Sequence, residues 1–574
     1  MIKETLETLV EISALLLSIF LALVIWVKYR KQQAEQQLPA PFDISPRAYH
    51  VGLVLSIIVY LILAVLLAIT NYDRLNPDAV SYLTIAQRYA QGEFVVRGYW
   101  SPLISWLLAP PIALGIGPQL SVNILMVIVG LVFSLLCLPL AKRFGLGRLY
   151  RLGIFIVIAI ISLYYLFTDI TPDLLGGIFV LLYFLVVTDR RYLERPVSLG
   201  SAAGLVGALA YYGKYYNIAF VAVHLIIHAG LLFFSRPTQR KQILLATSTA
   251  LAALFILISP WIYGIYQRYD TITISTSAAA NRAIVGPPLA DGSSPPGHQC
   301  WGSQLCDKPD DTLFPWEDPQ IEYYIPWSPF DNTDNLTYFV KLVASNIKQW
   351  PETLTVRHLQ SLSVLILGLS LVAAILFWKD TNARHQLIWL LLTIALYSGG
   401  YMLNYSGDFR YYLPIIPLVI ILTFYWVQVA TQIIPSAITN PRLQSICTIG
   451  LVGLTILSSA NPYSILWHIL NKPTPIACYD TDTRAIAEQL MAPVVGEGQY
   501  INYVSYFTQQ RTIGVIPAHL SPAETHAKIQ QYDVNTLVIN PTKAAALQDE
   551  FGYTLVEELQ ICDTDYAVLR PPAE

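Results

Sequence analysis

Ionisable side chains stand at the ends of several long apolar segments, where they could meet in one polar site. The first is Asp78, which follows an apolar run and precedes an amphipathic stretch, 80–90, with apolar residues near helical spacing. That stretch predicts a helix lying along the membrane surface. Asp78 could serve as a catalytic carboxylate in a pocket at this surface, or it could simply cap the helix that begins near Pro77.

Two further carboxylates, Asp169 and Asp173, occupy a short turn between two apolar segments. Ionisable groups near bilayer depth are costly and are functional candidates by default, although Asp173 could also cap the helix that follows it. Two acidic turns that open on the same side of a membrane favour a shared site over two separate caps.

Two basic residues are candidates for binding an anion at the same side. Lys214 stands among the tyrosines of 211–216, and Arg410 precedes Leu413 and Pro414 at the start of a late apolar segment. An arginine can hold a phosphate through paired N–H donors. The alternatives are that Lys214 snorkels in an aromatic belt, and that Arg410 anchors its helix or pairs with Asp408.

The amino-acid composition indicates that these residues belong to a membrane protein. The 574 residues are 55% hydrophobic and only 13% charged, with a mean hydropathy of +0.50. An ordinary soluble enzyme, with about 25% charged residues, is therefore excluded, and the bilayer is the solvent. The net charge of −3 and the lack of an extended basic patch argue against nucleic acid as a partner.

Apolar runs, broken by charged or proline-rich segments, predict an all-α polytopic membrane protein with about twelve transmembrane helices. The expected spans are 8–27, 50–70, 119–140, 151–167, 174–188, 198–211, 217–234, 242–262, 360–378, 387–403, 412–430 and 445–460.

The orientation follows from the basic residues, which gather in alternate loops and resist translocation. They include Lys28, Arg47, Arg143, Arg148, Arg191, Arg236, Lys241 and Lys379. These loops should face the cytoplasm. The segments 71–118 and 263–359, the short turns at 168–173, 212–216 and 404–411, and the tail after 461 should then lie outside. We therefore expect a multi-pass protein of the plasma (inner) membrane, with its active site and C-terminus on the outer, periplasmic face.

The chain divides into a membrane region, 1–470, and a tail, 471–574, in which the apolar runs become short. Alternating runs at 499–507 and 535–540, with helices expected at 521–531 and 543–551, predict a small α/β domain outside the membrane. Cys300 and Cys306 lie in the outside segment 263–359, and Cys478 and Cys562 bracket the tail. Each pair could form a disulfide in an oxidising compartment, or the four could be unrelated thiols.

The sequence contains no HExxH, CxxC, GxSxG or P-loop motif. His224 and His228 are four residues apart on one expected helix and could in principle bind a metal. Within an otherwise apolar span, packing at a helix interface is the favoured interpretation.

Taken in order, these features resemble the integral-membrane GT-C glycosyltransferases. The similarity is to the protein-mannosyltransferase-like group (family 39 type) and to the lipid A aminoarabinose transferases. It extends over most of the chain. It rests on Asp78 in the first outer loop, Trp100-Ser101-Pro102-Leu103, Thr171-Pro172-Asp173, Gly213-Lys214, the Arg410-Tyr411-Tyr412-Leu413-Pro414 run and the outer C-terminal domain.

The resemblance implies a hexosyl- or pentosyltransferase that moves a sugar, with inversion, from a polyprenyl-phosphate carrier to a glycan, lipid or protein acceptor. Asp78 would take the proton of the acceptor hydroxyl, which a carboxylate can do when desolvation raises its pKa. Cations would stabilise the departing phosphate. The remaining roles would fall to phosphate ligands Lys214, Arg410 and Arg97, and to pocket residues Tyr82, Tyr99, Trp100 and Tyr411.

The chain departs from the family pattern in two places. Many relatives have an acidic pair where this chain has Asp78-Ala79, and the aminoarabinose transferases have Lys-Pro-Pro where this chain has Trp100-Ser101-Pro102. Arg97 could substitute for that lysine. Some members of the class use a divalent cation, Mg or Mn, and Asp78, Asp169 and Asp173 could support one, although the sequence does not require it.

Two other functions are compatible with the same spans. One is a transporter or flippase of lipid-linked saccharides, and the other is an inactive scaffold of the same fold. Transporters place their binding groups near mid-bilayer and often carry inverted repeats. Here the ionisable residues stand at the outer ends of the spans and no repeat is visible, which favours the enzyme.

Overall fold

The structure is a computed structural model of the chain. It describes residues 42–72, 75–166, 170–288, 311–319, 326–353, 381–404, 407–433, 440–460, 489–497, 500–516, 520–561 and 564–572, with a few positions in 20–27 and 367–372. Most of the expected spans 8–27 and 360–378, the boundary at 470, Asp169 and the cysteines 300, 306, 478 and 562 lie outside the described residues.

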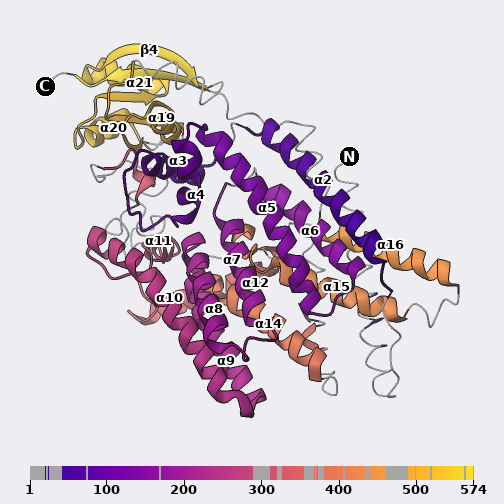
Figure 1. Cartoon of the computed structure of the whole chain (residues 1–574). Helices are drawn as coiled ribbons and strands as arrows, with labels where there is room; N and C mark the ends of the chain where they lie inside the picture. The colour runs from indigo at the N-terminus through magenta and orange to yellow at the C-terminus, as the bar shows by residue number, and fades with distance from the viewer. Residues whose placement is uncertain are drawn as a thin grey trace.

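Long apolar helices make up the main body of the molecule (Figure 1). Within the described part of the chain, six helices are long and apolar enough to cross a membrane: α2 (Pro46–Thr70), α5 (Pro118–Arg143), α6 (Arg148–Leu166), α9 (Tyr216–Ser235), α10 (Arg240–Tyr269) with the short η1 (Pro237–Gln239) before it, and α16 (Pro441–Ser459). The others are α7 (Asp173–Val187), α8 (Pro196–Gly213), α14 (Thr381–Met402) and α15 (Ile416–Ile433). Each expected span within the described residues corresponds to one of them, so the predicted multi-pass membrane protein is confirmed.

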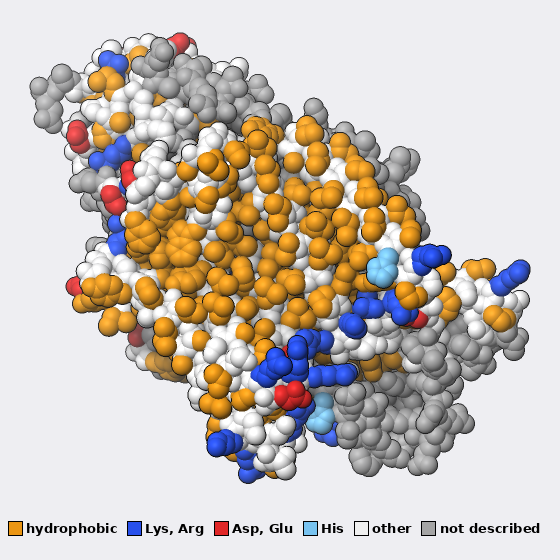
Figure 2. Space-filling model, in the orientation of Figure 1, with side chains coloured by type: hydrophobic (Ala, Val, Ile, Leu, Met, Phe, Trp, Pro, Cys, Tyr) orange, Lys and Arg blue, Asp and Glu red, His pale blue; other side chains and the backbone are white. Residues whose placement is uncertain are grey.

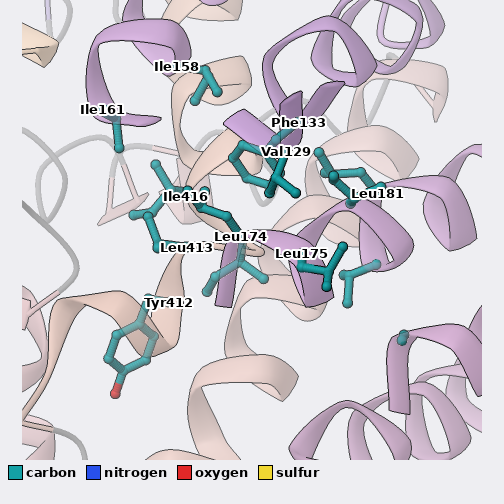
Figure 3. Close-up of a cluster of buried hydrophobic side chains, with 14 of the residues drawn as sticks. Val129, Phe133, Ile158, Ile161, Leu174, Leu175, Leu181, Tyr412, Leu413 and Ile416 are labelled. Carbon is teal, nitrogen blue, oxygen red and sulfur yellow. The ribbon is translucent and has the colours of Figure 1, made fainter. Parts of the chain in front are cut away.

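The helices pack through a continuous apolar core, of which Figure 3 shows one part. This part combines side chains of α5, α6, α7, the short helix η5 (Phe409–Tyr412) with the residue after it, and the start of α15, namely Val129, Phe133, Ile158, Ile161, Leu174, Leu175, Leu181, Tyr412, Leu413 and Ile416. Where small residues occur, the backbones approach more closely. A Cβ at Gly204 on α8 would overlap the carbonyl oxygen of Ala250 on α10.

The outer surface of the bundle is also apolar, as a membrane requires. Figure 2 shows a broad band of hydrophobic side chains across the bundle, with basic side chains gathered at its lower edge. On α2, the residues Val51, Val54, Leu55, Ile58 and Ile62 are all exposed. Two of the basic residues have acidic partners, Arg143 with Asp189 at 2.8 Å and Arg148 with Asp43 at 3.2 Å.

The remaining described helices of this region are α3 (Pro77–Ala90), α4 (Leu103–Ala113), α11 (Ser277–Ile284), η3 (Pro315–Glu317), α12 (Thr333–Thr353) and η5 (Phe409–Tyr412). The helix expected over 80–90 is therefore present and begins at Pro77. Helices α4 and α12 form where the sequence predicted only outer segments.

The tail forms a five-stranded sheet with three helices, and this confirms the small α/β fold. The order along the chain is β1 (Val494–Glu497), α19 (Tyr500–Thr508), β2 (Thr512–Ile516), α20 (Pro522–Ile529), β3 (Thr536–Ile539), α21 (Pro541–Phe551), β4 (Thr554–Ile561) and β5 (Thr564–Arg570). The strand order is β2-β1-β3-β5-β4, and β1 pairs in parallel with both of its neighbours. Figure 1 shows this domain beside α3, at one end of the bundle.

The alternating pattern of the run 499–507 is typical of a strand, but the described residues of this run, 500–507, lie in the helix α19. Ile501, Val504 and Phe507 recur every three residues, so the run fits a helix as well as it fits an alternating strand. The packing decides between them. Residues 501–507 are all buried, and the Tyr503 hydroxyl donates to the carbonyl oxygen of Leu75 at 2.8 Å.

Candidate functional site

A pocket of about 480 Å³ opens where α3, α7, the α8–α9 turn and η5 meet. Eight of the residues proposed from the sequence line it: Asp78, Asp173, Lys214, Arg410, Tyr82, Tyr99, Trp100 and Tyr411. These residues come from four segments that are far apart in the chain. Asp169, the remaining acidic candidate, lies outside the described residues.

Asp78 does not cap its helix, so that alternative is wrong. The N-cap of α3 is Asn76, and Asp78 lies within the first turn. Its Oδ2 accepts a hydrogen bond from Arg410 Nη1 at 3.0 Å, and its Oδ1 lies 3.5 Å from the indole Nε1–H of Trp316. The carboxylate therefore faces the pocket between a cation and an indole.

Lys214 and Asp173 form an ion pair in the same pocket. Lys214 directly follows α8, and Asp173 is the first residue of α7. They meet because the two backbones are in contact, since a Cβ at Gly213 would lie 2.9 Å from the Cα of Gly176. Burial lowers the pKa of Lys214 below its usual value, and the Asp173 carboxylate offsets part of that effect.

Arg410 enters the pocket from the short helix η5. Its Nε lies 2.7 Å from Asp408 Oδ2, in addition to the contact with Asp78. Burial opposes its charge, but the carboxylates of Asp78, Asp173 and Asp408 outweigh burial and raise the pKa of Arg410. The guanidinium remains charged and 18% exposed at the pocket wall.

The optional divalent cation does not fit the described carboxylates as they are arranged. Asp78 and Asp173 each hold a basic side chain, Arg410 and Lys214 respectively. Across the ranges that the structure describes, no three His, Cys, Asp or Glu side chains gather as metal ligands. A cation can therefore be given no ligand set in this part of the chain.

Arg97 requires a correction, because it does not line the pocket. Its side chain is only 1% exposed, and its Nη2 donates to Glu317 Oε1 at 2.7 Å. It belongs to an arginine–acid cluster, open to solvent at Asp311, that joins residues of the segment 71–118 to residues of 263–319 and consists of Arg88, Arg97, Arg268, Asp311, Glu317 and Asp318. Burial opposes the charge of Arg97, but Glu317 and Asp318 outweigh it and raise its pKa. Its expected role as a phosphate ligand does not fit this position.

Trp316 is a pocket residue that sequence reasoning missed. Its carbonyl oxygen accepts hydrogen bonds from Ser81 Oγ and Trp100 Nε1, both at 2.9 Å. Its ring packs 5.2 Å from Tyr99 and 5.5 Å from Trp100, measured between centroids. The run of acids at 311–318, which complements the arginines at 88 and 97, was the available signal that this segment returns to the first outer loop.

His224 and His228 pack at helix interfaces, as favoured. His224 Nδ1 lies 2.7 Å from the Tyr183 hydroxyl, and Trp389 Nε1 donates to His228 Nδ1 at 3.3 Å. These partners belong to α7 and α14. Both histidines therefore serve helix packing.

Comparison with known proteins identifies the fold. No protein-family model and no curated protein sequence matches the chain. Among solved structures, ArnT from Cupriavidus metallidurans in the apo state matches with a TM-score of 0.54 at 12% identity, covering 89% of this chain and 97% of ArnT. The same ArnT bound to undecaprenyl phosphate matches with a TM-score of 0.50 at 12% identity, covering 90% and 98%.

A third match is the oligosaccharyltransferase AglB from Archaeoglobus fulgidus, in complex with an inhibitory peptide and a dolichol-phosphate. Its TM-score is 0.46 at 10% identity, covering 84% of this chain and 69% of AglB. The match to ArnT extends over nearly the whole length of both proteins. The chain therefore has the polytopic membrane fold of ArnT, as expected from its resemblance to the GT-C glycosyltransferases.

Proposed function

We propose that the protein is a glycosyltransferase that moves a hexose or pentose from a polyprenyl-phosphate-linked donor to a hydroxyl acceptor. The transfer takes place at the outer face of the plasma (inner) membrane. One observation carries the proposal. A carboxylate, Asp78, and two cations, Lys214 and Arg410, converge on a single pocket at one end of a membrane bundle. A base and a pair of phosphate ligands are the groups that this transfer requires.

The positions of the basic loops support the outer face of the plasma (inner) membrane. Helix α7 begins at the pocket with Asp173 and ends near Asp189, which pairs with Arg143 at the basic end of the bundle. The pocket and the basic loops are therefore one helix length apart. Basic loops remain in the cytoplasm, so the pocket and the C-terminal domain belong outside.

In the proposed reaction, Lys214 and Arg410 bind the phosphate of the donor. The acceptor oxygen bonds to the anomeric carbon while the bond from that carbon to the phosphate oxygen breaks. The acceptor proton passes to Asp78, and the electron pair leaves on the polyprenyl phosphate. Attack from the side opposite the phosphate inverts the anomeric configuration. A positioned base contributes about 10²–10⁴-fold to such a step.

The ion pair of Asp78 with Arg410 fits an ordered sequence. Without donor, Arg410 partly neutralises the carboxylate, at 3.0 Å. A donor phosphate competes for the same guanidinium, and its arrival releases Asp78 to accept a proton. The carboxylate is then released from its ion pair when the sugar to be transferred is in place.

The opposite side of Asp78 is suited to the acceptor. There Trp316, Trp100 and Tyr99 form an aromatic wall of the pocket. Asn502 of α19 lines the same pocket, so the C-terminal domain contributes to its opening. The proposed donor agrees with the ligand of a protein of the same fold, since ArnT has been solved with undecaprenyl phosphate bound.

The test is Asp78→Asn, which keeps the shape of the side chain and removes its basicity. In cells that lack the native protein, the variant should leave the lipid-linked sugar to accumulate, with transfer reduced at least about 10²-fold at normal protein level. Mass spectrometry of membrane lipids and surface glycans measures both quantities and identifies sugar and acceptor. The exposed Asp334→Asn serves as the matched control and should transfer normally. Full transfer by Asp78→Asn would refute the proposal.

A further inference from the structure

The end of α14 brings two polar side chains, Tyr401 and Asn404, into the pocket wall. They lie on the side of the cations. The Tyr401 ring stacks on Tyr411, with centroids 5.0 Å apart and planes 5° apart, and Lys214 Nζ lies 4.3 Å from the Tyr411 ring centroid and 5.6 Å from that of Tyr401. Any group bonded directly to a phosphate held by Lys214 must therefore lie near this helix end.

Both side chains carry a buried polar atom whose hydrogen bonding is not met by the described residues. In this part of the chain Asn404 Oδ1 makes no hydrogen bond, and the Tyr401 hydroxyl approaches that of Tyr397, one helical turn earlier, without forming a well-aligned hydrogen bond. Tyr401 as a whole is only 8% exposed. Burying an unsatisfied polar atom costs free energy, and most such atoms in folded proteins have a partner. Two of them in one pocket wall point to a ligand that supplies the missing bonds.

The surrounding contacts hold both groups in place before a ligand arrives. The Tyr401 ring is packed between Tyr411 and Tyr216, whose ring centroid lies 3.9 Å away on the other side. The backbone at Asn404 is fixed by Asn346 of α12, which donates to the carbonyl oxygens of Met402 and Asn404 at 2.9 and 3.1 Å. Neither group has to be ordered by the ligand, which favours tight and selective binding.

We infer that Tyr401 and Asn404 form the subsite that recognises the sugar of the donor. The inference rests on the proposed function and deepens it. Asn404 Oδ1 can only accept a hydrogen bond, whereas the Tyr401 hydroxyl can donate or accept. The donor sugar must therefore present at least one hydroxyl or amino group toward α14. A site built to bond such a group discriminates strongly against a sugar that lacks it.

The experiment separates recognition of the sugar from recognition of the phosphate. The full-length protein in nanodiscs is titrated with undecaprenyl phosphate alone and with undecaprenyl-phosphate-linked glucose, mannose and arabinose. The ratio of the Kd for the bare carrier to the Kd for the tightest sugar-linked carrier is the sugar contribution. We expect a ratio of at least tenfold for the native protein. Tyr401→Phe and Asn404→Leu should each reduce it severalfold, while the Kd for undecaprenyl phosphate stays the same.

Thermal stability gives an independent readout and a matched control. Because the Tyr401 hydroxyl makes no well-aligned hydrogen bond to the described residues, Tyr401→Phe should not lower the Tm of the free protein. Tyr60 on α2 is also buried, does not line the pocket, and donates to the carbonyl oxygen of Val127 at 3.0 Å. Tyr60→Phe should therefore lower the Tm and leave the sugar contribution unchanged.

The outcomes distinguish the inference from the function on which it rests. The inference is overturned if the native protein binds undecaprenyl phosphate but binds none of the three sugar-linked carriers more tightly than the bare carrier. It is also overturned by a sugar contribution that both Tyr401→Phe and Asn404→Leu leave intact. A native protein that binds neither the bare carrier nor its sugar-linked forms would instead overturn the proposed function.

Discussion

The arginine–acid cluster allows a quantitative prediction, because one carboxylate in it, that of Glu317, is fully buried and binds two arginines. Glu317 Oε1 accepts from Arg97 Nη2 at 2.7 Å and from Arg88 Nη1 at 2.8 Å, and Oε2 accepts from the amide of Leu313 at 2.7 Å. The side chain is fully buried. Glu317→Gln keeps its volume but leaves Arg97, itself 1% exposed, without its closest charged partner.

Removing one partner from a buried ion pair costs about 3–5 kcal/mol. Asp311 Oδ2 and Asp318 Oδ2 remain 3.0 and 3.6 Å from Arg97 Nη1, so we expect the lower end of that range. About 3 kcal/mol corresponds to roughly a 10²-fold change in the equilibrium between the docked and open forms of the segment 311–319. Because Trp316 belongs to this segment, the aromatic side of the pocket should open with it.

Hydrogen exchange of the detergent-solubilised protein, followed by mass spectrometry, measures this equilibrium at the amides of 313–318. Glu93→Gln is the matched control. Glu93 also binds Arg88, at 2.8 Å, but is 51% exposed, so its loss should cost at most about 1 kcal/mol. If Glu317→Gln accelerates exchange in 313–318 by less than about fivefold, the cluster does not hold this segment and the reasoning fails.

Two further predictions concern the lysine of the pocket. Gly213→Ala should separate α7 from α8, because the added Cβ would lie 2.9 Å from the Cα of Gly176. We expect a loss of about 1–3 kcal/mol in the free energy of unfolding and weaker binding of undecaprenyl phosphate. The control variant Gly230→Ala should be tolerated, because no atom beyond its own stretch of helix lies within 4 Å of the added Cβ. Thermal unfolding and titration measure both effects, and an unchanged Gly213→Ala would contradict the close contact. Because burial lowers the pKa of Lys214 and only its charged form attracts phosphate, carrier affinity should fall as the pH rises, beginning below the usual lysine pKa of about 10.4. In the Lys214→Arg variant the carrier affinity should no longer fall over this pH range. Identical pH profiles of carrier affinity for the native protein and the variant would disprove the role of Lys214.

The membrane helices could be predicted from the sequence because the signal for each is local. Every described span follows from the length of one apolar run and the charged or proline-rich residues that break it. The first residues of α7 and the residue after α8 were recognisable for the same reason, since Asp173 and Lys214 interrupt apolar sequence. Their convergence was inferred from sidedness, and the structure brings both into one pocket.

The parts that could not be predicted depend on contacts between distant segments. Trp316 reaches Asp78 across 238 positions of sequence, through a loop with no strong pattern of its own. Tyr401 was indistinguishable from the other tyrosines of an apolar helix, because its inferred role depends on a hydroxyl that makes no well-aligned hydrogen bond to the described residues. Residues 501–507 are buried on all sides, and a short run that is apolar all round does not distinguish a helix from a strand by its pattern.

The two arginines considered as phosphate ligands show why residue type alone does not identify a site. Both stand next to aromatic residues in outer segments, at 97 and 410. Arg97 forms ion pairs with Glu317, Asp311 and Asp318, which belong to a segment more than 200 residues away. These carboxylates neutralise its charge within the protein. Arg410 also has acidic neighbours, but one of them, Asp78, lies at the pocket wall with it, and both side chains remain about one-fifth exposed.

That difference has a chemical consequence. A guanidinium in a closed cluster cannot exchange its partner without opening the fold, whereas one at a pocket wall can exchange a carboxylate for a phosphate at little cost, because water and ligand reach it directly. Binding a donor therefore requires a cation whose partner can be displaced. One partner of Arg410 in this pocket is Asp78, the proposed base, so in the proposed reaction the exchange that admits the donor would also free that carboxylate to take the acceptor proton.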